Sequence, residues 1–147
     1  MTEYTISLSY KVSNKTVEFD TGSTSPSPPG SSKTGSDDDG NVTVDKGDTA
    51  SIEYECSTSG YSLAEVQMKT KGRDKWGKQK GKNRLDSDAA EDFPDVPADS
   101  GTVTPDSTDK IKIKDDNKKS SKVDYRVGIN DDGTIIWSDP RVKNNGD

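Results

Sequence analysis

Apolar and polar residues alternate along several short segments of the chain. In residues 4–12 every second residue is apolar, namely Tyr4, Ile6, Leu8, Tyr10 and Val12. Because successive side chains of a strand point to opposite faces of a sheet, this period of two predicts a strand with one buried face. The same alternation predicts further strands at 17–19, 42–44, 50–56, 64–70, 111–113, 123–129 and 134–137.

No segment carries apolar residues at positions i, i+3, i+4 and i+7 over three turns, so the pattern predicts no helix. Seven to nine short strands without helices are typical of an all-β fold, and we expect an immunoglobulin-like antiparallel β-sandwich. The length of 147 residues fits one such domain, 1–147.

Two hydrophilic segments interrupt the strands. Residues 20–40 are rich in Ser, Gly and Pro and contain no large apolar residue, so we expect a flexible loop. Residues 71–109 begin strongly basic and continue acidic and proline-rich, and we expect a second polar loop without regular structure. The 25% hydrophobic content of the chain therefore predicts a thin core gathered in the alternating segments.

The charge balance limits the classes of partner. With 21 basic and 27 acidic residues the net charge is −6, which argues against nucleic-acid binding because phosphates require a positive surface. No apolar run approaches the roughly 18 residues of a membrane span, and no leader pattern is visible at the first residues, so we expect a cytoplasmic protein without membrane contact. The single cysteine, Cys56, forms no intrachain disulfide and suits a reducing compartment.

Two stretches resemble known β-sandwich domains. Residues 44–54, with a Gly-Asp turn before alternating positions, resemble the early hairpin of immunoglobulin-like domains, and Tyr54 stands at the position of their first cysteine. Residues 125–140 are similar to the end of fibronectin type III modules, with Val127 at the second cysteine position. The early stretch also resembles cupredoxins, but a blue-copper site needs histidines and this chain has none.

The chain as a whole resembles the DP-EP family of small bacterial proteins of uncharacterised function. The resemblance rests on the N-terminal alternating strand, the Gly-Asp hairpin, Gly60-Tyr61-Ser62 and the terminal segment 139–146. The resemblance implies a β-sandwich fold and points to no particular activity.

Candidate chemistry is sparse. The absence of histidine removes the commonest general base and all Ser-His and Cys-His nucleophile pairs, so we predict neither an enzyme nor a cofactor. Cys56 is either a reactive thiol or a small buried hydrophobe, and the second interpretation is favoured because no basic residue adjoins it. The carboxylates of Asp37, Asp38 and Asp39 could bind a divalent ion weakly, but their spacing is not that of an EF-hand and favours an ordinary turn.

Two non-enzymatic functions remain open. The chain could be a structural or interaction module that associates with itself or another protein through edge strands, such as the N-terminal strand or 123–129. Alternatively, the basic loop 69–84 could bind an acidic or carbohydrate partner. An aromatic platform could be formed by Trp76, Tyr61 and Trp137, with Lys75 and Arg73 nearby to donate hydrogen bonds. Because Trp137 lies in the final strand, it is expected in the core instead. We prefer the first function because no convergent set of polar residues is visible.

Overall fold

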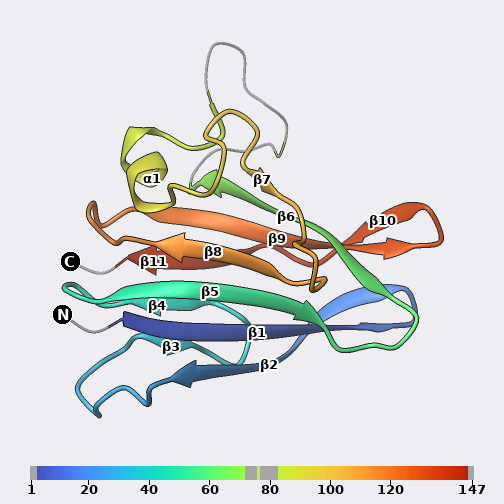
Figure 1. Ribbon diagram of the computed structural model, residues 1–147, viewed down its shortest axis with the longest axis horizontal. Helices are drawn as coiled ribbons and strands as arrows, with labels where there is room; N and C mark the ends of the chain where they lie inside the picture. Colours follow the sequence, from blue (N-terminus) through green and yellow to red (C-terminus); the bar gives the residue numbers. More distant parts are fainter. Residues whose placement is uncertain (1–2, 72–75, 77–82, 146–147) are drawn as a thin grey trace.

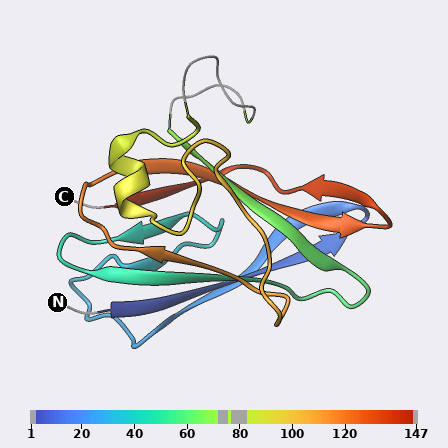
Figure 2. The same ribbon diagram turned by 45° about the horizontal axis from the view of Figure 1, so that its top comes forward.

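The computed structural model describes residues 3–71, 76 and 83–145, and within them the chain forms a two-layer β-sandwich (Figures 1 and 2). One four-stranded sheet, sheet A, has the order β2-β1-β5-β8. The other, sheet B, has the order β3-β4-β11-β9-β6-β7, with β10 paired to β9. The strands are β1 Glu3–Ser13, β2 Thr16–Ser25, β3 Gly35–Ser36, β4 Val42–Val44, β5 Thr49–Cys56, β6 Ser62–Thr70, β7 Thr102–Val103, β8 Ile111–Asp115, β9 Lys122–Asp131, β10 Thr134–Trp137 and β11 Arg141–Asn145.

The prediction of an all-β sandwich is confirmed, but the pairing is mixed rather than purely antiparallel, and the described residues form eleven strands. β1 pairs parallel with β5, and β4 pairs parallel with β11. Parallel neighbours cannot be joined by a tight hairpin. Here the chain leaves sheet A after β2, forms β3 and β4 in sheet B and then returns to place β5 beside β1.

The alternating rows predicted from the sequence form the core between the sheets. From β1 the core receives Tyr4, Ile6, Leu8 and Tyr10, and from β9 it receives Val123, Tyr125, Val127 and Ile129. Ala50, Ile52 and Tyr54 add the row of β5. Each row is buried because the polar residues between its members take the outward positions of the pleat.

Three tyrosines lie within this core and differ in how their hydroxyl groups are satisfied. The Tyr125 hydroxyl donates to the Gly40 carbonyl oxygen, and the Tyr10 hydroxyl donates to Tyr125 at 2.7 Å. The Tyr54 ring packs edge-on against Tyr125, with centroids 5.4 Å apart. Among the described residues, the buried Tyr54 hydroxyl has no hydrogen-bond partner.

This difference predicts opposite outcomes for two chemically identical changes. Tyr125→Phe should lower the free energy of unfolding by about 1–3 kcal/mol, because it leaves two buried partners unsatisfied. Tyr54→Phe removes a hydroxyl group that bonds to nothing described, so the expected change is within about 0.5 kcal/mol. Urea unfolding of both variants measures the difference, and equal losses would contradict this hydrogen-bond assignment.

The predicted loop 20–40 is partly strand. β2 continues to Ser25, where Ser25 pairs with Thr5 and Ser23 with Ser7 of β1. The prediction missed this extension because ladder hydrogen bonds involve only the backbone, so a polar sequence can pair along an edge without burying side chains. The short β3 follows within the same segment.

The predicted unstructured segment 71–109 contains a helix and part of the core. Helix α1, Ser87–Asp92, is capped by Asp86, whose side chain accepts a hydrogen bond from the Ala89 N–H. Leu85, Ala89, Phe93 and Val96 are buried. A six-residue helix cannot show a repeat over three turns, so the sequence criterion overlooked it. The residues after α1 continue to β7, which pairs with β6.

The two strands proposed as assembly edges are interior strands. β1 lies between β2 and β5, and β9 lies between β11 and β6, so their backbone groups are already paired within the chain. In sheet A the described edges are β2 and β8. On β8 the Asp95 carboxylate accepts from the Lys114 N–H at 3.1 Å, which blocks part of that edge. Among the helices of the described residues, none has the length and apolar character needed to cross a membrane.

Candidate functional site

The outer surface of sheet B carries an arginine between two tryptophans. Because the odd-numbered residues 123–129 of β9 point into the core, Arg126 points outward. Its guanidinium carbon lies 3.9 Å from the Trp137 ring centroid and 4.8 Å from that of Trp76. The arrangement brings β9, β10 and the segment after β6 to one place, and both contacts are within cation–π range.

Gln67 of β6 fixes the orientation of this arginine. Gln67 lies opposite Arg126 in the β6–β9 ladder. Its Oε1 accepts from Arg126 Nε at 3.0 Å and from Nη2 at 2.7 Å, while its Nε2 donates to Glu65 at 2.9 Å. The guanidinium plane is therefore held by polar contacts as well as by stacking. We call Trp76, Arg126, Trp137, Gln67 and Lys69 the tryptophan–arginine face.

Trp137 was expected in the core, and the structure corrects this. Trp137 pairs with Gly128 across the β9–β10 ladder, and its ring covers that glycine on the outer surface. A Cβ atom at position 128 would lie 2.8 Å from Trp137 Cζ3, so glycine is needed for the ring to lie close to the sheet. Ile135 points to the same side and is 39% exposed, the large apolar residue most open to solvent in the described chain. The core position of β10 is taken by Ile136 instead.

Among the described residues at the face, three cations, Arg126, Lys69 and Arg84, lie near two anions, Asp124 and Glu65. Lys69 Nζ lies 5.1 Å from the Trp76 ring centroid and 3.1 Å from the Asp124 carboxylate. Burial, followed by the positive charge of the nearby Arg84, lowers the pKa of Arg126, while Glu65 opposes this shift. The Nε of Arg84 is buried without a hydrogen-bond partner among the described residues. Two neighbouring guanidinium groups create a local field that favours an anion.

The structure brings together only part of the predicted binding platform. Trp76 is half-buried and contacts Arg126 and Lys69. Arg73 and Lys75 lie outside the described residues. Tyr61 precedes β6 at the end opposite to Lys69, and it packs against the core, so it does not join Trp76.

Arg126 and Gln67 were missed as site residues, and Trp137, considered for the platform, was assigned to the core. The predicted strand 123–129 already placed Arg126 on the outward row, which is the signal that could have identified it. Its tryptophan neighbours could not be inferred, because they come from separate segments joined only by strand pairing.

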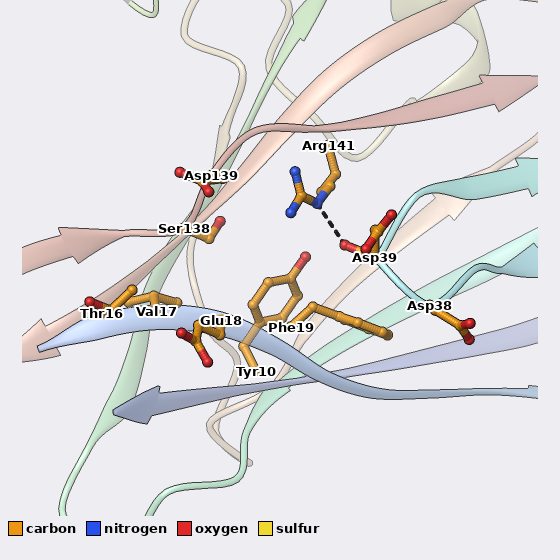
Figure 3. A pocket seen from close by; sticks show the side chains of 10 residues that line it. All are labelled: Tyr10, Thr16, Val17, Glu18, Phe19, Asp38, Asp39, Ser138, Asp139 and Arg141. Atoms are coloured by element: carbon orange, nitrogen blue, oxygen red, sulfur yellow. Dashed lines mark hydrogen bonds between the residues drawn. The ribbon is translucent and has the colours of Figure 1, made fainter. Parts of the chain in front are cut away.

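A separate pocket of about 300 Å³ lies between β1, β2 and the turn before β4 (Figure 3). Arg141 points into it, with Nε donating to the Asp39 carbonyl oxygen at 2.6 Å and Nη1 to that of Pro140 at 3.2 Å. The Tyr10 hydroxyl at its base bonds to Tyr125, and burial raises the pKa of Tyr10 to about 12. These polar groups bond to the protein's own chain: the Tyr10–Tyr125 bond joins sheet A to sheet B, and the Arg141 bond to Asp39 holds β11 to the turn before β4.

In the aspartate run beside this pocket, Asp37 stabilises the turn before β4. Asp37 accepts hydrogen bonds from the Asp39 N–H at 2.9 Å, and from the backbone and side-chain N–H groups of Asn41 at 2.9 and 3.0 Å. Burial alone would raise the pKa of Asp37, but these hydrogen bonds outweigh it and lower the pKa. Asp38 and Asp39 line the pocket wall. Within the described ranges, no three acidic or cysteine side chains are grouped to hold a metal ion.

Cys56, the last residue of β5, is a free and partly buried thiol. It packs against the core, and its Sγ lies 3.8 Å from the Thr58 carbonyl oxygen. These contacts agree with a small packing residue.

The fold and the face together define an all-β sandwich that carries a cationic, aromatic surface on one sheet. In comparisons with known proteins, no family model matches the chain and no curated protein is significantly similar to it. The resemblance to the DP-EP family therefore stays a prediction.

Proposed function

We propose that the protein is a non-enzymatic interaction module that binds an acidic segment of a protein partner through the tryptophan–arginine face. The observation that carries the proposal is the position of Arg126 between two tryptophan rings and beside a second guanidinium group. This arrangement is a convergent polar set of the kind that the sequence alone did not reveal.

The chemistry of the face favours a carboxylate ligand. A guanidinium group binds carboxylates through paired, charge-assisted hydrogen bonds. The Trp76 and Trp137 rings lie against the Arg126 guanidinium group and displace water from it, and a lower local dielectric strengthens such bonds. The sequence of the segment 69–84, which includes Lys69 and Arg84, holds eight Lys and Arg residues and one acidic residue, Asp74.

The net charge of −6 strengthens the preference of an acidic partner for this face over the rest of the surface. The rest of the surface repels an acidic partner, so the cationic face would direct its approach. Self-assembly through edge strands has less support, because β1 and β9 are interior and the β8 edge is partly blocked. The proposed location remains the cytoplasm, since the single cysteine is a free thiol.

Removing the charge of Arg126 is expected to weaken binding of poly-L-glutamate by about tenfold or more. Arg126→Gln deletes the charge-assisted hydrogen bonds, whose worth of roughly 1.5–3 kcal/mol corresponds to this loss. Lys112→Gln is the matched control, because it removes one positive charge from the exposed side of sheet A. Tryptophan fluorescence provides the readout, since the chain's two tryptophans both contact Arg126.

The same titration separates the alternatives. Equal weakening by Arg126→Gln and Lys112→Gln would show that the chain responds to net charge alone, against the proposal. Binding of a neutral oligosaccharide such as cellohexaose in place of poly-L-glutamate would assign the face to carbohydrate and would also contradict it. Raising the salt concentration from 0.1 to 1 M shortens the screening length from about 10 to 3 Å, so the proposed binding should weaken strongly.

A further inference from the structure

A lysine and an aspartate with no solvent exposure lie in contact at one end of the sandwich. Lys143 belongs to β11 of sheet B and Asp115 ends β8 of sheet A, and both residues are 0% exposed. Lys143 Nζ lies 2.5 Å from Asp115 Oδ2. Burying a charged pair away from water costs free energy. The presence of the Lys143–Asp115 pair inside a small hydrophobic core therefore suggests a role beyond packing.

The second oxygen of Asp115 is held by two N–H donors. Asp115 Oδ1 accepts from the Asn117 backbone N–H at 3.0 Å and from Asn145 Nδ2 at 2.8 Å. Both distances suit stabilisation of an oxygen on which negative charge develops. The other contact of Asn145 Nδ2 is the buried Asp92 carboxylate at 3.0 Å, which holds the amide in place.

The surroundings of the lysine favour its reactive form. The Phe93 ring centroid lies 4.8 Å from Lys143 Nζ. Burial lowers the pKa of Lys143, while Asp115 and Asp92 oppose this shift. Burial thus moves the side chain toward the neutral amine, which is the nucleophilic state.

We propose that Lys143 and Asp115 condense within the folded protein to form an intramolecular amide bond between Nζ and Cγ. Lys143 Nζ is already held 2.5 Å from a carboxylate oxygen of Asp115, and such fixed proximity replaces the high concentrations that an intermolecular condensation would need. The bond would join β8 to β11, and therefore sheet A to sheet B, in a chain whose single cysteine forms no disulfide within it.

The atoms balance without a co-reactant. The Lys143 ammonium group transfers a proton to Asp115 Oδ2, giving an amine beside a neutral carboxyl group. Nζ then attacks Cγ, and the negative charge that forms on Oδ1 is stabilised by Asn117 N–H and Asn145 Nδ2. A second proton passes from Nζ to Oδ2, the Cγ–Oδ2 bond breaks, and water leaves. One ammonium and one carboxylate thus become one amide and one water.

Intact-mass spectrometry of the purified full chain tests the proposal. After prolonged incubation of the folded protein at neutral pH, the chain should be lighter than its calculated mass by one water molecule. Proteolysis should then release a branched peptide that contains both Asp115 and Lys143, identified by fragmentation. A chain of full calculated mass would overturn the proposal, leaving a buried ion pair.

Two controls test whether the mass loss comes from an amide between Lys143 and Asp115. Asp39-Gly40 and Asp132-Gly133 can also lose water by cyclising to succinimides, so a loss that maps to either dipeptide would overturn the proposal. Lys143→Arg keeps a positive charge beside Asp115 but cannot form the amide, and it should restore the full mass. Because the decisive measurement uses the unaltered protein, it does not depend on how well the variant folds.

Discussion

Replacing Asp92 by alanine is expected to lower the free energy of unfolding by about 3–5 kcal/mol, as for other buried charged networks that lose one member. Asp92 is 0% exposed, and its carboxylate accepts hydrogen bonds from the segment before β9. Its Oδ1 accepts from the backbone N–H groups of Lys118 and Lys119 at 2.6 and 2.8 Å, and its Oδ2 accepts from the Ser121 hydroxyl at 2.6 Å. The variant would leave the buried Ser121 hydroxyl without this partner and would remove the acceptor of the Lys118 and Lys119 backbone N–H groups.

The pH dependence gives this prediction a second readout. Burial alone would raise the pKa of Asp92, but the hydrogen bonds from Ser121, Asn145 and Lys119 outweigh it and lower the pKa. A carboxylate with a lowered folded-state pKa stabilises the protein fully above its unfolded value of about 3.9, and the contribution is lost as the pH falls through the folded value. The stability of Asp92→Ala should therefore depend less on pH in the acid range than that of the unaltered protein.

Guanidinium unfolding at several pH values measures both effects, with Glu91→Ala as the control. Glu91 precedes Asp92 in α1 and is exposed, with a long ion pair of 3.7 Å to Lys119. Its removal should cost no more than about 1 kcal/mol. If the two variants lost the same stability, Asp92 would not be the centre of this network.

Phe93→Ala should destabilise the protein by about 3–5 kcal/mol, the range for removing a large buried aromatic side chain. Phe93 is 0% exposed and follows α1 within the segment that the sequence predicted to be unstructured. The loss arises from the cavity left beside Ala89 and Leu85, which share its core cluster.

Chemical unfolding of Phe93→Ala, compared with Val103→Ala in the same segment, measures this effect. Val103 is only partly buried where β7 meets β6, so its truncation should cost clearly less. An unchanged stability in Phe93→Ala would mean that the segment 83–103 is not part of the folded core.

The strand pattern was predictable because a half-buried strand leaves a direct mark on the sequence. In residues 4–12 and 123–129 the buried side chains are the alternating apolar ones, except that Val12 is only partly buried and Ser9 and Gly128 are buried as well. Helix α1 and the extension of β2 left no comparable mark, since one is too short for a helical repeat and the other buries few side chains. The parallel neighbours follow from the path of the chain between sheets, which local pattern does not encode.

The candidate site was predictable only in part, because its members meet through pairing between distant segments. Trp76 attracted attention as an apolar residue in a basic loop, but its contacts with Arg126 come from the β6–β9 ladder. Lys143 and Asp115 were overlooked because charged residues are ordinarily predicted to lie on the surface. The two residues are 28 positions apart in the sequence. They are buried together only because the two sheets pack against each other.

A nuclear magnetic resonance titration of the isotope-labelled protein with poly-L-glutamate tests the proposed binding face most directly. The two indole N–H signals, from Trp76 and Trp137, and the Nε–H signal of Arg126 should shift together as the probe saturates, while the amide of Lys112 on sheet A stays in place. Shifts centred on Arg141 and the pocket of Figure 3, or no shifts at all, would contradict the account.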